Sequence, residues 1–309
     1  MRISLEEAAK ELIKGQVVAV PTETVYGLAA SIHHPEAIQK IFSLKGRPLD
    51  NPLIVHLSEW PEITPYIKTL PFGTKELALA FWPGPLTLVL EIFEKLVPFD
   101  VRAGLPTAAF RIPHHPLTKK LLKLTGPLVM PSANKSGRPS STQVKHIEED
   151  FGQEFPILDG GACQQGVEST ILGHVENHWV IFRLGAIAPE MFLPIIGEIP
   201  LLKTHHGQRP VCPGQQYRHY SPQAKLTLVK SIPEKAEGIV LGFEDRAYPL
   251  PLLSLGNTRN PQNVAQNLYS ALRQLDIEKI SQAWVDMDFP REGLWLTIAE
   301  RLQKAASIN

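Results

Sequence analysis

The residues best suited to chemistry lie in short polar segments, the first of which is KGRPLDNPLIVH at positions 45–56. It places Lys45, Arg47, Asn51 and His56 around the expected start of a strand. The two cations suit a polyphosphate, and the carboxamide and the imidazole can orient a smaller polar ligand beside it. A lysine and an arginine at a helix end can also be an ordinary solvated terminus, so this segment needs support from other motifs.

A second segment, GLPTAAFRIP at positions 104–113, places Thr107 and Arg111 four residues apart around the entry of another expected strand. An arginine within an apolar strand is costly to bury without a partner. Its planar fork matches a substrate carboxylate, which is one candidate partner. An internal salt bridge with an aspartate or a glutamate is the other.

Hydroxyl-rich segments supply a third kind of group. PTET at 21–24 follows an expected buried strand, and ligands of α/β sheets bind where such strands end. PSANKSGRPSST at 131–142 lies between a strand and a helix, where N–H and O–H donors can face phosphate oxygens. VESTI at 167–171 leads into a strand, and Arg183 lies on the next one. Capped turns and Ser-rich surface loops have the same composition, so that interpretation stays open.

Residues 203–223 lack apolar periodicity, which is typical of a linker. Within them, YRHYSP (217–222) contains Arg218, His219 and Tyr220, an unusual set for a spacer. Aromatic rings and cations of this kind could stack on a base or close over phosphates.

Alternating strand and helix patterns must position these segments, and they predict an α/β fold. We expect a first domain with one twisted mixed sheet at 1–202, the linker at 203–223, and a small α/β domain at 224–309. Strands are expected at 17–20, 53–57, 86–92, 109–112, 128–130, 169–172, 179–184, 226–229, 238–242 and 283–285. Helices are expected at 4–15, 35–46, 74–81, 117–124 and 142–150, around an apolar stripe at 264, 268, 272 and 275, and from about 292.

Composition excludes several classes of protein. The 309 residues carry no formal net charge, which argues against diffuse attraction to nucleic acid. No Walker A, dinucleotide-binding, zinc-protease or nucleophile-elbow motif occurs, and two cysteines suggest neither a disulfide framework nor a zinc site. The acidic start of the chain and the lack of long apolar runs predict a cytoplasmic protein without a membrane span.

The polar segments occur in a definite order along the chain: PTETVYGL, KGRP with NPLIVH, the Thr107/Arg111 strand, PSANKSGRPSST, VESTI, Arg183 and RHYSP. In this order they resemble the YrdC-like threonylcarbamoyl-AMP synthases in their longer, two-domain form. The resemblance extends from Leu5 to about Pro222. It implies a YrdC-like twisted mixed sheet with flanking helices, and a small Rossmann-like α/β domain at the C-terminus.

The resemblance also implies a reaction, in which L-threonine, bicarbonate and ATP give L-threonylcarbamoyladenylate and pyrophosphate. Mg²⁺ accompanies ATP, and downstream tRNA-modification proteins consume the product. By the same resemblance, L-threonine binds to Thr24, His56, Arg111 and Ser169, with Arg111 on its carboxylate. ATP binds to Arg47, Asn51, Thr107, Ser132, Asn134, Ser140, Arg183 and Tyr220, with Lys45 as an added phosphate contact. Whether Ser132 faces threonine or ATP stays open, and Arg218 and His219 belong to a linker expected to close as a lid.

An alternative from another class is an RNA-binding or ribosome-maturation module of the same fold. The neutral net charge argues against RNA as the main ligand, although weak RNA binding remains compatible with a local basic groove. Release of pyrophosphate that needs threonine and bicarbonate together would separate the two interpretations.

Overall fold

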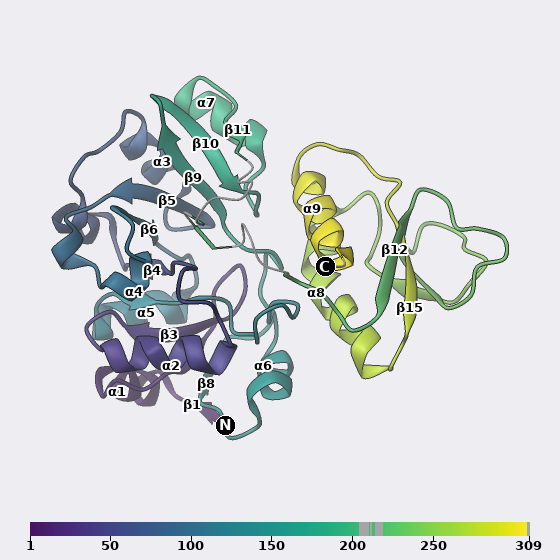
Figure 1. Ribbon diagram of the computed structural model, residues 1–309, viewed down its shortest axis with the longest axis horizontal. Helices are drawn as coiled ribbons and strands as arrows, with labels where there is room; N and C mark the ends of the chain where they lie inside the picture. The colour runs from purple at the N-terminus through teal and green to yellow at the C-terminus, as the bar shows by residue number, and fades with distance from the viewer. Residues whose placement is uncertain (204–209, 211, 214–218, 308–309) are drawn as a thin grey trace.

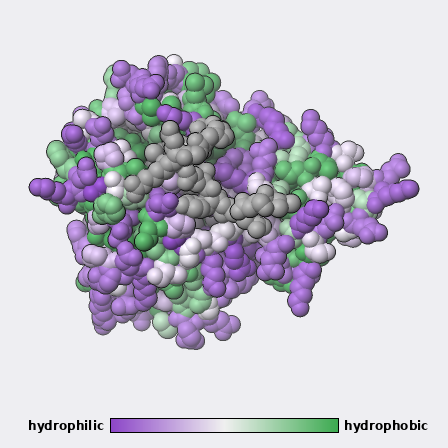
Figure 2. Space-filling model, in the orientation of Figure 1, coloured by the Kyte–Doolittle hydropathy of each residue, from purple (hydrophilic) through white to green (hydrophobic). Residues whose placement is uncertain are grey.

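The chain folds into two α/β units, each built on its own sheet (Figure 1). The computed structural model describes residues 1–203, 210, 212–213 and 219–307. The larger unit contains β1 to β11, and the C-terminal unit contains β12 to β15. No helix in these ranges is long and apolar enough to cross a bilayer. On the face shown in Figure 2, hydrophilic side chains cover much of both units.

The larger unit is organised around a mixed sheet with the strand order β1-β8-β2-β3-β7-β4-β6-β5-β9-β10-β11 in the described part of the chain. Its strands are β1 (Arg2–Ile3), β2 (Val18–Val20), β3 (Gly27–Ser31), β4 (Ile54–His56), β5 (Leu86–Glu91), β6 (Thr107–Arg111), β7 (Leu128–Val129), β8 (Ile157–Leu158), β9 (Thr170–Val175), β10 (His178–Arg183) and β11 (Leu201–Leu202). The pairs β4–β6 and β5–β9 are parallel, whereas β2–β3, β5–β6 and β9–β10 are antiparallel. The predicted twisted mixed sheet is therefore confirmed.

Helices cover both faces of this sheet. They are α1 (Leu5–Ile13), α2 (Pro35–Lys45), α3 (Thr74–Phe81), α4 (Phe99–Arg102), α5 (Pro116–Thr125), α6 (Val144–Phe151) and α7 (Leu193–Ile196), with 3₁₀ turns at Trp60–Tyr66, Glu94–Leu96 and Pro189–Phe192. Along β2, Val18 and Val20 join the core beneath α1 and α5, while Ala19 joins the core that contains α2 and α6 residues. Burial on both faces explains why this strand is an unbroken apolar run in the sequence.

Local signals in the sequence set the ends of the first helices. Ser4 and Glu7 form a capping box, in which Ser4 Oγ accepts from the Glu7 N–H at 3.2 Å and Glu7 Oε2 accepts from the Ser4 N–H at 2.8 Å. Pro35 occupies the first position of α2, and Gly46 ends it in the left-handed conformation, with φ of 61°. Because the helix ends here, the chain changes direction and continues into Arg47 and the polar segment that follows.

The C-terminal unit has a parallel sheet with the order β12-β15-β13-β14. Its elements are β12 (Lys225–Val229), β13 (Ile239–Gly242), β14 (Leu252–Ser254), α8 (Pro261–Ile277), β15 (Gln282–Asp286) and α9 (Leu294–Ala306). The predicted stripe of α8 is buried, with Val264, Leu268, Leu272 and Leu275 each fully inaccessible. In Figure 1, α8 and α9 lie between this small sheet and the larger unit.

Several strands were not expected from the sequence, and β3 is the most important of them. Four of its five residues, GLAAS, are small and have weak strand propensity. They form a strand because β2 and β7 pair with its two edges, and all five are buried. The short strands β1, β8, β11 and β14 likewise depend on pairing with distant segments.

Candidate functional site

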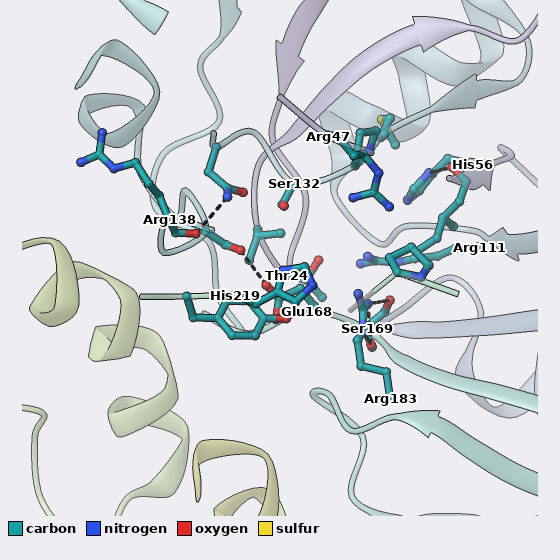
Figure 3. Close-up of a pocket in the computed structure, with 18 residues that line it drawn as sticks. Thr24, Arg47, His56, Arg111, Ser132, Arg138, Glu168, Ser169, Arg183 and His219 are labelled. Atoms are coloured by element: carbon teal, nitrogen blue, oxygen red, sulfur yellow. Dashed lines mark hydrogen bonds between the residues drawn. The ribbon is translucent and has the colours of Figure 1, made fainter. Parts of the chain in front are cut away.

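The polar segments converge on one pocket, which encloses about 620 Å³, part of it open to solvent (Figure 3). Its polar lining comprises Thr24, Arg47, His56, Arg111, Ser132, Asn134, Arg138, Ser140, Glu168, Ser169, Arg183, His219 and Tyr220. Three arginine side chains, those of Arg47, Arg111 and Arg183, share the described lining with a single glutamate, so the pocket is suited to an anionic ligand. The guanidinium of the fourth arginine, Arg138, is directed away from the pocket and pairs with Asp150 (Figure 3).

The sheet brings two of these side chains together at the ends of parallel strands. His56 is the last residue of β4, Arg111 is the last residue of β6, and the two residues are paired in register. Thr24 follows the end of β2 and is buried. The sequence predicted a strand end only for the segment of Thr24 and placed His56 and Arg111 near strand entries, whereas the structure places both at carboxyl ends, where ligands of α/β folds bind.

His56 is neutral in this environment. Burial, and then the positive charge of Arg111, hold its pKa well below the ordinary value. The Nδ1 atom lies 3.1 Å from the carbonyl oxygen of Ile54, so the proton of the neutral ring belongs on Nδ1. The other nitrogen, Nε2, is then a hydrogen-bond acceptor available to a ligand.

Arg111 has the internal partner that the sequence left open. Its Nη2 donates to Glu23 Oε1 at 2.6 Å, and its Nε donates to the Gly84 carbonyl at 3.2 Å. The side chains of Arg111 and Glu23 are 5% and 4% exposed, so this is a buried ion pair. Nη1 makes no hydrogen bond to a described residue, and Arg111 lines the pocket. The internal salt bridge and a ligand contact are therefore compatible.

Arg47 lines the pocket, and its neighbour Asn51 orients it. Arg47 Nη2 donates to Asn51 Oδ1 at 2.6 Å and to the Pro52 carbonyl at 2.7 Å, while Nε donates to the Asn51 carbonyl at 3.1 Å. Asn51 is buried and is not among the lining residues. Its carboxamide fixes the Arg47 guanidinium, so its geometry favours a supporting role over the direct ATP contact that the resemblance implied.

Lys45 also lies behind the pocket wall. Its ammonium donates to the backbone carbonyls of Ser132 and Asn134, the latter at 2.6 Å. Burial, and then the charge of Arg47, lower its pKa well below the ordinary value. Lys45 is therefore a brace for the 131–142 loop, and its position does not support the expected phosphate contact.

The loop at 131–142 contributes Ser132, Asn134 and Ser140 as expected, together with Arg138. Asn134 Nδ2 donates to the carbonyls of Lys135 and Arg138 at 2.8 and 3.0 Å. Its Oδ1 is buried and has no partner among the described residues, so an acceptor is left for a ligand. Arg138 was missed, although its place in a hydroxyl-rich segment was the available signal.

Glu168 is a second lining residue that the sequence reasoning missed. Its Oε1 accepts from Ser140 Oγ at 2.6 Å, and its Oε2 accepts from Tyr269 Oη at 2.8 Å and Arg301 Nε at 3.0 Å. Burial alone would raise its pKa, but the charges of Arg301 and Arg183 and the two hydroxyl donors outweigh burial and lower it to about 2. The carboxylate is ionised, and two of its three donors come from the C-terminal unit.

Ser169 and Arg183 form the wall next to Glu168. Arg183 Nη2 donates to the carbonyl of Ser169 at 2.9 Å and to its Oγ at 3.0 Å. The Ser169 hydroxyl also lies 2.7 Å from the hydroxyl of Thr87. These contacts hold both pocket residues in place between β9 and β10.

Thr107 is not brought to the pocket. It is the first residue of β6, whereas Arg111 is the last, and four strand steps separate them by roughly 13 Å. Thr107 lines a different cavity, beside Glu91 and His174. The interpretation of Thr107 and Arg111 as one entry cluster was wrong, because a strand is extended and carries its two ends apart.

The end of the linker reaches the pocket. His219 and Tyr220 line it, and the Ser221 N–H donates to the carbonyl of Gly137 at 2.8 Å. His219 is buried, which is the main cause of a pKa lowered to about 3, and its Nε2 has no partner among the described residues. Two residues of the predicted lid segment, His219 and Tyr220, therefore lie at the site, and Arg218 lies outside the described residues.

The pocket fits Mg²⁺ that arrives with a nucleotide better than Mg²⁺ held by protein ligands alone. No cluster of three His, Cys, Asp or Glu ligands occurs among the described residues. Glu168 already accepts three hydrogen bonds, whereas Asn134 Oδ1 remains an unpaired acceptor. Mg²⁺ commonly keeps several waters and binds through substrate phosphates, which suits this donor set.

Family models match both units of the chain. The Sua5/YciO/YrdC model, described as telomere recombination, matches residues 10–185, and the model of the threonylcarbamoyl-AMP synthase C-terminal domain matches residues 187–307. A threonylcarbamoyl-AMP synthase of Bacillus subtilis is 37% identical over 98% of this chain and 92% of its own length. That of Pyrococcus abyssi is also 37% identical, over 97% and 93%.

A solved structure agrees with these matches. The crystal structure of P. abyssi Sua5 complexed with L-threonine superposes with a TM-score of 0.89 at 35% identity, covering 99% of this chain and 96% of that one. Agreement over nearly the full length includes both units. The chain therefore belongs to the threonylcarbamoyl-AMP synthase family, in its two-domain form with a Sua5-type C-terminal domain.

Proposed function

We propose that this chain is an L-threonylcarbamoyladenylate synthase, which converts L-threonine, bicarbonate and ATP into L-threonylcarbamoyladenylate and pyrophosphate. The observation that carries the proposal is the convergence of Arg47, Arg111 and Arg183 on one hydroxyl-lined pocket, in which Glu168 is the single carboxylate among the described lining residues. Near-full-length relatives are named for this activity, and one was solved with L-threonine.

L-threonine is assigned to the edge of the sheet where Thr24, His56, Arg111 and Ser169 meet. The Nη1 group of Arg111 points its remaining donors to the threonine carboxylate, while Nη2 stays with Glu23. His56 Nε2 accepts from the hydroxyl or amine of threonine because the ring is neutral. Bicarbonate supplies carbon dioxide by losing hydroxide. The amine nitrogen bonds to its carbon and gives up a proton, which leaves with the hydroxide as water, and a carbamate forms beside these groups.

ATP is assigned to the neighbouring wall, formed by Arg47, Ser132, Asn134, Ser140, Arg183 and Tyr220. One carbamate oxygen attacks the α-phosphorus, the bond to the β-phosphate breaks, and pyrophosphate leaves. No protein nucleophile is required, because the two substrates react with each other. The protein contributes by holding them in line and by neutralising charge on the phosphates.

Mg²⁺ bound to ATP would neutralise phosphate charge and polarise the reacting phosphoryl group. Asn134 Oδ1, which has no partner among the described residues, would be available to accept a hydrogen bond from a water that the ion carries. His219 and Tyr220 would shield the mixed anhydride product from water as a closing segment, which is a role for the linker. We place the enzyme in the cytoplasm, where ATP and tRNA occur, and the product is passed to other tRNA-modification proteins.

The test is release of pyrophosphate by the purified full chain, with omission of each substrate in turn. The expected result is release that requires ATP, Mg²⁺, L-threonine and bicarbonate together, with an adenylate that contains carbon from labelled bicarbonate. Release that is independent of threonine would refute the proposal. Tight RNA binding without pyrophosphate release would instead favour the RNA-binding alternative.

A further inference from the structure

Two arginines of the C-terminal unit insert into the larger unit and are almost completely buried. Arg273 on α8 pairs with Asp150 at 2.9 Å and donates to the Pro139 carbonyl at 2.7 Å. Arg301 on α9 pairs with Glu168 at 3.0 Å and donates to the Leu184 carbonyl at 2.7 Å. Their side chains are 1% and 0% exposed. The units are thus joined by buried charges as well as by apolar packing.

Buried ion pairs are a poor means of stabilising an interface, because desolvation offsets most of the attraction and apolar residues of similar volume often serve as well. What such a pair does provide is a fixed orientation for each charged group. Asp150 also binds the pocket residue Arg138, but Glu168 itself lines the pocket. The contacts of Arg301 therefore bear most directly on the site.

Glu168 connects α8 and α9 to the ATP wall through hydrogen bonds. Arg301 Nε donates both to Glu168 Oε2 and, at 3.1 Å, to Tyr269 Oη, whose own proton goes to the same carboxylate oxygen. The other oxygen, Oε1, accepts from Ser140. The position of the Ser140 hydroxyl is thus set by a carboxylate that the C-terminal unit holds.

The same two residues hold the Tyr220 ring. Tyr269 stacks on it, with ring centroids 5.3 Å apart and planes inclined by 22°, and the Arg301 guanidinium lies 4.9 Å from its centroid. Tyr220 adopts a φ of 63°, an uncommon conformation for a residue with a side chain. Packing between a tyrosine and an arginine of the C-terminal unit supports this conformation at the mouth of the pocket.

We propose that the C-terminal unit is a positioning part of the ATP site, acting through Arg301 and Tyr269 on Glu168, Ser140 and Tyr220. The inference rests on the proposed function, since it assigns this wall of the pocket to ATP. Arg301 and Tyr269 do not line the pocket; they fix three residues that do. In the threonine wall, His56 and Arg111 make no hydrogen bond to this network in the described part of the chain, whereas Ser169 follows Glu168 directly along the chain.

The first test compares Tyr269→Phe with Tyr248→Phe. Both tyrosines donate to a carboxylate of the chain, Tyr269 to Glu168 at 2.8 Å and Tyr248 to Asp286 at 2.7 Å, but Tyr248 lines a different cavity, within the C-terminal unit. Loss of a hydrogen bond to a charged group changes an equilibrium constant by at least about tenfold. We expect Tyr269→Phe to raise the KM for ATP and the Kd of a non-hydrolysable ATP analogue about tenfold, and the KM for threonine much less. Tyr248→Phe should change none of them.

A second comparison of two variants replaces arginines. Arg301→Lys keeps the positive charge but loses the planar guanidinium. Arg246→Lys makes the same change at an arginine that likewise pairs with a carboxylate, that of Asp286, and lies 5.3 Å from the centroid of the Phe243 ring. The expected loss of ATP affinity is confined to Arg301→Lys. If Arg301→Lys does not fold, thermal unfolding will show it, and the tyrosine pair still decides the question.

A double-mutant cycle separates positioning from general damage. If Tyr269 acts through Glu168, then Tyr269→Phe should have little further effect in a Glu168→Gln background. Additive losses, equal losses in the KM for ATP and threonine, or equal effects of Tyr269→Phe and Tyr248→Phe would overturn the inference. Absence of threonine-dependent pyrophosphate release in the unmodified chain would instead overturn the proposed function, and analogue binding would still test the network.

Discussion

The buried pair of Arg111 and Glu23 makes one prediction especially sharp, because it separates folding from threonine recognition. Replacing Arg111 alone with Met leaves the Glu23 carboxylate, which is 4% exposed, without its ion-pair partner at 2.6 Å. Removing one member of a buried pair costs about 3–5 kcal/mol of unfolding free energy. Arg111→Met is therefore expected to lower the unfolding midpoint markedly, for reasons unrelated to substrate.

The double variant Arg111→Met with Glu23→Gln removes both charges. The carboxamide introduced at position 23 would keep an oxygen that can accept from the His114 N–H, which donates to Glu23 at 3.0 Å in the native protein. We expect this variant to regain most of the lost stability. It should still lack the threonine contact, and a charge-assisted hydrogen bond of about 1.5–3 kcal/mol corresponds to about 10- to 150-fold in the KM for threonine.

The assay measures urea unfolding and threonine-dependent pyrophosphate release for both singles and the double variant. Glu23→Gln alone is the matched control, since it loses the ion pair yet keeps Arg111, and its KM for threonine should stay near that of the native chain. The KM for ATP should change little in all three. If the double variant recovers threonine use together with stability, Arg111 is only the partner of Glu23 and its assignment to the substrate carboxylate is refuted.

Three further predictions concern the surroundings of the pocket. Lys45→Met should speed hydrogen exchange in the 131–142 loop, because two backbone carbonyls lose their donor at about 1–3 kcal/mol each; unchanged exchange would contradict the bracing role. His146 has a pKa lowered to about 3, mainly by burial, so the unfolded chain takes up its proton first. Its contribution to the free energy of unfolding is present above about pH 6.5 and is lost toward about pH 3, at about 1.4 kcal/mol per pH unit. When the free energy of unfolding is measured against pH, His146→Asn should reduce the slope in this window by the amount that corresponds to one proton. Calorimetry should show tight Mg²⁺ binding only when ATP is present, and tight binding to the protein alone would contradict the view that the ion arrives with the nucleotide.

The sequence by itself determined the polar segments, their order and most of the elements around them. Capping at Ser4, the stop at Gly46 and the stripe of α8 are local signals, so they could be recognised before any fold was known. The sequence placed PTET at a strand end but His56 and Arg111 near strand entries. The structure shows both residues at the carboxyl ends of parallel strands, and such ends share one edge of the sheet. His56 and Arg111 meet there for that reason.

Only the tertiary structure decided which polar residues face the pocket and which support it. Among the polar residues of these segments, type and position in the sequence did not separate those that face the pocket from those that do not. Lys45 and Asn51 brace the pocket wall, and Thr107 lies at the opposite end of β6 from Arg111. Glu168 became part of the site through partners on α8 and α9, at least 101 residues away along the chain. Such contacts depend on how the two units pack, and no local pattern of residue types encodes that.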